Sequence, residues 1–97
     1  VMEMPMAYSV SQNYPNPFNP VTTIHYELPV HSHVTIMIYN LMGRRVTTLI
    51  NEIEVPGYKS VVWDGTDSFG KQVSTGVYLY QIRAGSFTRV RKMALLK

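Results

Sequence analysis

Apolar and polar residues alternate along much of this chain, and that period of two most constrains its fold. In residues 24–28, and again in residues 34–38, every second side chain is apolar. A period of two sends alternate side chains to opposite faces of a strand, so each stretch is typical of a half-buried β-strand. No window of useful length has a helical period. The pattern therefore predicts an all-β fold.

Turn signals divide the chain into six or seven short strands. Clusters rich in proline, glycine, asparagine and aspartate separate the apolar stretches. Strands are expected at residues 21–28, 34–39, 46–50, 58–64, 76–82 and 87–96. Many short strands bounded by turns are typical of an antiparallel immunoglobulin-like β-sandwich.

The first two long strands are expected to form a hairpin around residues 29–33. Pairing position 28 with 34, 26 with 36 and 24 with 38 would put all their apolar residues on one face. The predicted core consists of these residues and Trp63: Ile24, Tyr26, Leu28, Val34, Ile36 and Ile38.

Three prolines lie close together in residues 13–20, which read Asn-Tyr-Pro-Asn-Pro-Phe-Asn-Pro. Proline lacks an amide donor and disfavours helix at the preceding residue, so neither a helix nor a central strand is expected there. The segment is predicted to be extended and irregular, with Tyr14 and Phe18 against the body of the domain.

Chain length and the lack of cysteine exclude several classes of protein. Ninety-seven residues make one domain rather than a two-lobed enzyme. Without cysteine there is no disulfide framework, cysteine zinc site or thiol nucleophile. No apolar run approaches the ~18 residues that a membrane-spanning helix needs.

The charges are unevenly distributed along the chain. Residues 1–67 hold three basic and all six acidic residues, whereas residues 68–97 hold six basic residues and no acidic one. A basic strip of this kind is either a footprint for an anionic partner or the solvated face of two strands. Nucleic acid is not an expected partner.

Candidate metal ligands and catalytic groups are sparse. His31 and His33 with His25 suggest a metal site, but a hairpin turn is an ordinary place for histidine and no acidic third ligand is fixed nearby. Asp64 and Asp67 suggest calcium, although aspartates in turns usually cap backbone amides. The sequence contains no nucleophile elbow, no pair of carboxylates typical of a glycosidase and no glycine-rich phosphate-binding loop. We expect no enzyme activity, metal or cofactor.

Aromatic residues offer a different candidate site. Trp63, Tyr78, Tyr80, Tyr39 and Tyr8 could stack on sugars if they were exposed in one row. Trp63 is in phase with apolar neighbours, and large rings are seldom left in water without use. Core positions are therefore the favoured interpretation.

Ordered sequence blocks identify a resemblance. The blocks, in chain order, are these: Gln12 to Pro20, Thr22-Thr23-Ile24, Ile38-Tyr39-Asn40-Leu41-Met42-Gly43-Arg44, Gly57-Tyr58, Val62-Trp63-Asp64-Gly65, Asp67, Gly70, Ser74-x-Gly76-Val77-Tyr78 and Lys92-Met93 to Lys97. From about residue 8 onward this series resembles the type A C-terminal sorting domain of the bacterial type IX secretion system. That domain has an immunoglobulin-like fold similar to that of the flagellar hook-capping protein. Asn40 stands where many relatives have aspartate.

The resemblance implies a non-catalytic domain that directs a larger cargo protein, by way of the periplasm, to the cell surface or outside. Residues 8–97 would be the sorting domain, and residues 1–7 the remnant of a linker. The implied partners are a covalently linked N-terminal cargo domain, the outer-membrane translocon and a surface sortase. An anionic lipopolysaccharide, to which the sortase can join the cargo, is a further implied partner.

The resemblance also implies which residues are recognised. They are Gly76 and Tyr78 of a Gly-x-Tyr motif, Gly85 at the last turn, and Lys92 and Lys97 on the terminal strand. The alternative is a structural or carbohydrate-adhering accessory module of an extracellular glycosidase or peptidase. A row of exposed aromatic rings would favour that alternative, and an exposed, ordered basic edge would favour sorting.

Overall fold

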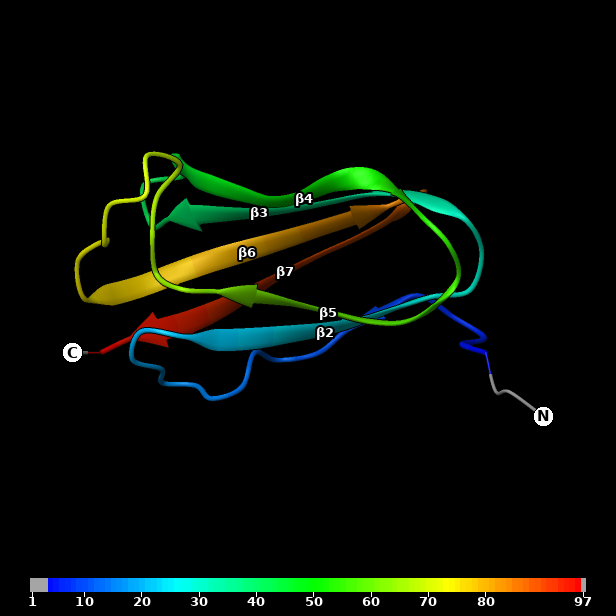
Figure 1. The fold of residues 1–97 in the computed structure, drawn as a ribbon, viewed down its shortest axis with the longest axis horizontal. Helices are drawn as coiled ribbons and strands as arrows, with labels where there is room; N and C mark the ends of the chain where they lie inside the picture. The colour runs from blue at the N-terminus through cyan, green and yellow to red at the C-terminus, as the bar shows by residue number, and fades with distance from the viewer. Residues whose placement is uncertain (1–3, 97) are drawn as a thin grey trace.

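Two antiparallel sheets pack face to face in the computed structural model, which describes residues 4–96 (Figure 1). The strands are β1 (Ser9–Val10), β2 (Thr22–Leu28), β3 (Ser32–Asn40), β4 (Arg45–Glu54), β5 (Gly57–Trp63), β6 (Gly76–Ala84) and β7 (Phe87–Leu95). One sheet has the order β1-β2-β5 and the other β4-β3-β6-β7. The predicted antiparallel sandwich is confirmed, with seven strands in this part of the chain.

The predicted hairpin between β2 and β3 is wrong. β2 pairs with β1 and β5, whereas β3 pairs with β4 and β6. The three residues between β2 and β3 therefore carry the chain from one sheet to the other. Alternation determines which side chains point inward but not which sheet a strand joins, because both sheets turn their apolar faces to one core.

The predicted core is confirmed despite that error. All of its members are buried: Ile24, Tyr26, Leu28, Val34, Ile36, Ile38 and Trp63. The Trp63 ring lies at the centre of an aromatic cluster, with centroids 5.6 Å from Phe18 and 5.4 Å from Tyr78. The strands β6 and β7 add Tyr80, Ile82, Met93 and Leu95 to the same core.

Residues 10–18, which we call the covering segment, lie along the outer edge of β7. The Phe18 amide donates to the Ala94 carbonyl at 2.9 Å, and the Leu96 amide donates to the Phe18 carbonyl at 2.8 Å. The Asn16 side-chain oxygen accepts a hydrogen bond from the Ala94 amide at 3.0 Å. An edge strand with open amides and carbonyls can pair with a foreign strand, so this covering protects β7.

The two aromatic residues of the proline-rich stretch behave differently. Phe18 is buried, as predicted. The prediction for Tyr14 is wrong for its side chain, which is 78% exposed, although its backbone pairs with Thr23. Local sequence shows that both rings are apolar but not which of them the irregular backbone turns inward.

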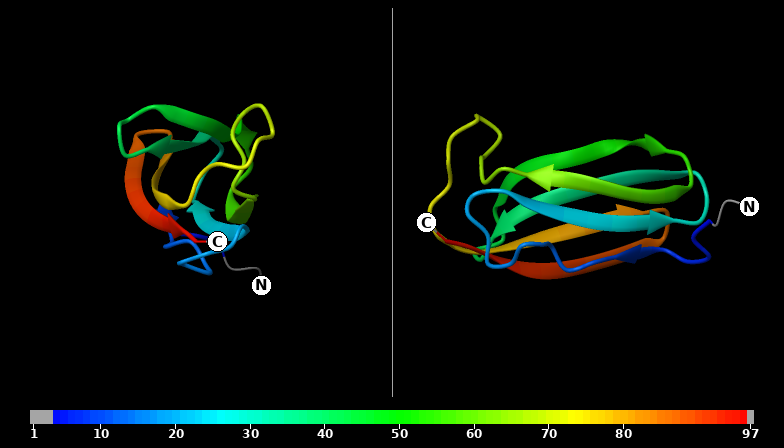
Figure 2. Two further views of the ribbon diagram at one scale, coloured as in Figure 1. Left: turned by 90° about the vertical axis from the view of Figure 1, so that its left-hand side faces the viewer. Right: turned by 60° about the horizontal axis from the view of Figure 1, so that its bottom comes forward.

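The molecule has two distinct ends along its longest dimension of 43 Å. The loops of residues 41–44 and 64–75 and the end of β7 lie at one end, which we call the loop end (Figures 1 and 2). The first described residues and the turns before β3, before β5 and before β7 lie at the other, which we call the turn end.

Candidate recognition surface

The residues expected to be recognised lie on the β6–β7 hairpin, but not together. Gly76 pairs with Leu95 and Tyr78 with Met93, so these positions lie at the loop end, and Lys92 is one residue before Met93. Gly85 lies in the turn between β6 and β7, at the turn end. Lys97 lies outside the described residues.

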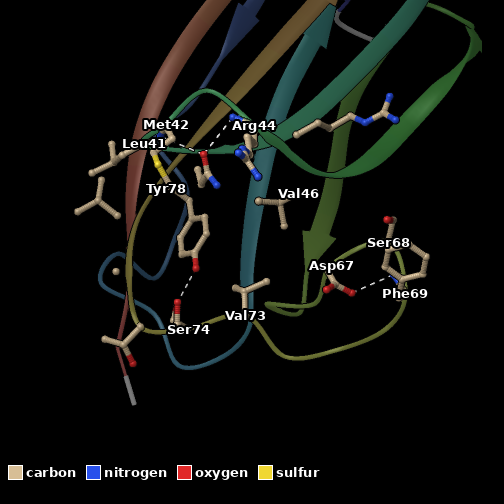
Figure 3. A pocket seen from close by; sticks show the side chains of 15 residues that line it. Leu41, Met42, Arg44, Val46, Asp67, Ser68, Phe69, Val73, Ser74 and Tyr78 are labelled. Carbon is tan, nitrogen blue, oxygen red and sulfur yellow. Dashed lines mark hydrogen bonds between the residues drawn. The ribbon is translucent and has the colours of Figure 1, made fainter.

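Tyr78 is a buried residue whose hydroxyl fixes the loop before β6. The hydroxyl donates to the Ser74 carbonyl at 2.6 Å (Figure 3). Its ring meets the Trp63 ring edge-on. A tyrosine that bonds the backbone a few residues upstream has the pattern of the tyrosine corner of immunoglobulin-like domains. Because the ring is buried, Tyr78 shapes the surface rather than presenting itself to a partner.

The two glycines meet different constraints. Gly85 has a φ of +58°, and a Cβ there would lie 3.0 Å from the Tyr8 hydroxyl oxygen. A left-handed conformation and this close approach both favour glycine, so the turn itself explains Gly85. No atom lies within 4 Å of the Cβ position of Gly76. Packing therefore does not require glycine at Gly76, although its φ of +158° favours glycine, and the space above it is open.

Lys92 is exposed on the outer face of the four-stranded sheet, as predicted from the burial of Met93 beside it. Its side chain borders a shallow hollow of about 170 Å³ that Asn16, Val77 and Ala94 also line. Its backbone carbonyl accepts a hydrogen bond from the Gln12 side chain at 2.6 Å. The lysine is therefore held on an ordered strand with its ammonium group free to meet a partner.

The basic C-terminal third does not form one strip. Arg83 and Lys92 alternate with buried residues and face outward from the four-stranded sheet. Arg89 and Arg91 belong to the opposite face of β7, where Arg89 lies over the Phe87 ring at 4.9 Å and Arg91 donates to the Val10 carbonyl at 3.0 Å. A single anionic surface cannot contact all of these cations at once.

The residues considered for metal binding have other surroundings. Within residues 4–96, no three side chains of His, Cys, Asp or Glu gather as a metal site would require. Asp67 accepts hydrogen bonds from the Phe69 and Lys71 amides at 2.9 and 3.0 Å. Asp64 likewise accepts from the Thr66 amide at 3.1 Å. Both aspartates thus cap turns.

The favoured core interpretation of the aromatic residues is confirmed for Trp63, Tyr78 and Tyr80, which are buried. Tyr8 is half-buried and packs at the edge of the core. The interpretation is wrong for Tyr39, which is half-buried on the outer face of β3. The exposed rings of Tyr14, Tyr58 and Phe69 belong to three separate parts of the fold. They do not form the row that would stack on a sugar chain. No helix in the described part of the chain is long and apolar enough to cross a membrane.

A groove of about 590 Å³ opens at the loop end beside Tyr78 (Figure 3). Its walls come from residues 40–42, 44–46, 67–69 and 73–78. The groove was not predicted from sequence, because segments distant in the chain form it. The available signal was the placement of large apolar residues, Leu41, Met42 and Phe69, inside turns where polar residues are the rule.

Comparison with known proteins adds a family and two structures. Residues 12–95 match the family model described as "Secretion system C-terminal sorting domain". The fold is similar to part of dimeric latent PorU from Porphyromonas gingivalis, with a TM-score of 0.73 at 20% identity over 99% of this chain and 10% of that chain.

A second similar structure is PorZ, described as an essential surface component of the type-IX secretion system of Porphyromonas gingivalis. Its TM-score is 0.63 at 20% identity, over 93% of this chain and 11% of that chain. The chain thus spans about a tenth of each of these proteins. No curated protein sequence matches it closely enough to count as a relative.

Proposed function

The chain belongs to the family of secretion system C-terminal sorting domains, and from that premise we propose that its β6–β7 hairpin carries the features that the outer-membrane translocon recognises. The domain itself is a non-catalytic sorting signal of the type IX secretion system. It directs a linked cargo protein through the periplasm to the cell surface or the extracellular space. The sequence-based resemblance is confirmed.

One observation carries the proposal: an exposed lysine stands on an ordered strand, β7, whose partner strand β6 begins at a glycine with open space around it. Lys92 offers a charge, and Gly76 leaves room for a partner to approach the backbone. Tyr78 and Gly85 have positioning roles, because one is buried and the other forms the turn. The sequence resemblance adds Lys97, which lies outside the described residues, to the proposed recognition residues. The adhesive alternative loses support because Trp63, Tyr78 and Tyr80, three of the five rings it invoked, are in the core.

The proposed domain boundary is residue 8. The Tyr8 ring stacks on Phe87 at 5.5 Å, and the Tyr8 and Ser32 hydroxyl oxygens are 2.8 Å apart. Residues 1–7 form the proposed linker to an N-terminal cargo domain, and within it Met6 is exposed whereas Pro5 is buried. A surface sortase would cut there and leave the Tyr8 contacts intact. An anionic lipopolysaccharide is the proposed acceptor of the released cargo.

Export of a reporter tests the proposal. Residues 8–97, placed behind a signal peptide and a reporter in a bacterium with the type IX apparatus, should carry the reporter past the outer membrane. The double variant Lys92→Ala and Lys97→Ala should lose export while its melting temperature is kept, because exposed substitutions usually change stability by less than about 0.5 kcal/mol. Lys71→Ala, in the loop before β6, is the matched control and should be exported.

Two results would count against the proposal. A folded, intact wild-type fusion that stays in the periplasm would remove the sorting role of this chain. Normal export of the double lysine variant would leave the sorting role but withdraw recognition from Lys92 and Lys97.

A further inference from the structure

Three large apolar side chains stand exposed around the groove at the loop end. Leu41 is 64%, Met42 81% and Phe69 88% exposed, and all three line the groove (Figure 3). Single exposed apolar residues are ordinary, but a cluster beside a concave surface marks a place of interaction. Val77, also partly exposed, extends the cluster onto β6 next to Gly76.

Hydrogen bonds order the backbone of the two loops that carry Leu41, Met42 and Phe69. The Asn40 side-chain oxygen accepts from the Met42 and Arg44 amides at 2.9 and 3.0 Å. The Asp67 carboxylate does the same for the loop that carries Phe69. The two loops are joined where the Ser68 amide donates to the Val46 carbonyl at 3.1 Å. A surface ordered before binding loses little conformational entropy when a partner docks.

The net charge of the groove lining is positive. Arg44 and Arg45 are exposed on its rim. Asp67 is the acidic residue in the lining, and one of its carboxylate oxygens accepts hydrogen bonds from two backbone amides, so two cations face one anion there. Asn40 contributes no charge. Charge complementarity therefore favours a partner that brings carboxylates to the rim.

From this cluster and its charge we propose that the groove docks a protein segment with an apolar side chain flanked by acidic residues. The proposal rests on the proposed function, since the partner would be a component of the secretion apparatus. The apolar side chain enters between Met42 and Phe69, and its acidic neighbours meet Arg44 and Arg45. A buried apolar anchor within a polar rim is the usual anatomy of a protein interface.

The place of the groove suits such a partner. The loop end lies at the opposite end of the long axis from the first described residues (Figures 1 and 2). A cargo domain joined before residue 8 would therefore extend from the turn end. A partner could dock at the groove without meeting the cargo, whatever that cargo is.

Export measurements test the docking. In the fusion of residues 8–97, Met42→Asp combined with Phe69→Asp should lower export about tenfold or more, the scale of losing a hot-spot anchor. The matched control is Ile53→Asp, a 74% exposed apolar residue near the turn end, which should be exported normally. Thermal unfolding of the purified domains should show the variants folded.

The outcomes separate this inference from the proposed function. A wild-type fusion that is not exported overturns the sorting role and this inference with it. If the wild type and the double variant are exported at equal rates, docking at the groove is overturned and the sorting role stands. Loss of export in the control variant Ile53→Asp as well overturns docking at the groove, because any new surface charge would then be enough to block export.

A photo-crosslinking amino acid at position 69 identifies the chemistry of the partner. The crosslinked peptide, sequenced by mass spectrometry, should contain an apolar residue next to aspartate or glutamate. The double variant Arg44→Glu and Arg45→Glu should abolish the crosslink. The control variant Arg83→Glu should keep it. A basic or wholly polar crosslinked peptide overturns the proposal. Binding of the purified domain to phosphatidylethanolamine–phosphatidylglycerol vesicles, if lost in Phe69→Asp, would assign the groove to a membrane instead.

Discussion

The two long sides of the sandwich are closed in different ways. Beside β7, the covering segment supplies backbone partners to the strand edge. On the other side, β4 and β5 each pair with a single strand among the described residues, and the edges between them stay open. Within residues 4–96, backbone hydrogen bonds therefore close the β7 side of the domain and leave the β4–β5 side open.

On each long side of the sandwich, the hydroxyl of one buried tyrosine bonds to residues outside the tyrosine's own sheet. The Tyr80 hydroxyl donates to the Ser11 carbonyl at 2.7 Å and accepts from the Asn13 amide at 2.9 Å, so it binds the covering segment by its backbone. The Tyr26 hydroxyl donates to the Glu54 carboxylate at 2.6 Å, across the open side. The first link is fixed by the fold, whereas the second depends on one ionisable side chain.

The largest expected effect comes from removing the anchor of the covered side. Phe18→Ala should lower the free energy of unfolding by about 3–5 kcal/mol, because a buried phenylalanine is replaced by a cavity next to Trp63. Equilibrium urea unfolding measures the change. Tyr14→Ala, four residues earlier but exposed, is the control and should cost less than about 0.5 kcal/mol. Equal losses in the two variants would show that the segment does not close the domain through Phe18.

Tyr80→Phe should have the next largest effect. It removes one hydroxyl and leaves the Asn13 amide without its partner in a buried place, which costs about 1–3 kcal/mol. The same urea experiment measures it, and hydrogen exchange should show faster exchange of the Asn13 amide. Unchanged protection of that amide would contradict the proposed tie between β6 and the covering segment.

The sequence predicted the members of the core better than their arrangement. Alternation sufficed to place Ile24, Ile36 and Trp63 inside, because burial follows from the face of a strand. It could not separate a hairpin from a crossing between sheets, since both bury the same residues. The role of the covering segment was also invisible, because its bonds join residues 12–18 to residues some 80 positions later.

The candidate site was predictable to a similar degree. Lys92 was placed outward from its alternation with Met93, and the structure agrees. Tyr78 is buried and Gly85 forms a turn, and a motif alone does not reveal such surroundings. The groove could not be predicted, because it depends on how loops of three segments meet at one end of the sandwich.

Alkaline pH should weaken the open side. Burial raises the pKa of Tyr26 above its ordinary value of about 10, and the hydrogen bond to Glu54 raises it further. Above about pH 10 the unfolded chain releases this proton while the folded chain keeps it, so the free energy of unfolding falls as pH rises. Tyr26→Phe should cost about 0.5–1.5 kcal/mol at pH 8 and should show a shallower alkaline decline than wild type.

Urea unfolding at a series of pH values from 8 to about 11 measures both effects on Tyr26. Burial also raises the pKa of Tyr80, so wild type carries two such contributions and Tyr26→Phe retains one. Identical alkaline slopes in wild type and Tyr26→Phe would show that the Tyr26 hydroxyl is not held across the open side.

The smallest effect on stability, and the sharpest test of the comparison, concerns self-association. Lys59 lies on the inward-facing side of the edge strand β5, opposite Tyr26 and in phase with Trp63. An inward-pointing charge on an edge strand hinders pairing with a second chain. Lys59→Val should therefore change the free energy of unfolding by less than about 0.5 kcal/mol, yet promote dimers in sedimentation velocity experiments. Lys92→Val removes the same charge from β7, whose edge the covering segment occupies, and should remain monomeric. Dimers formed equally by both variants would mean that added surface hydrophobicity, rather than an open strand edge, drives association.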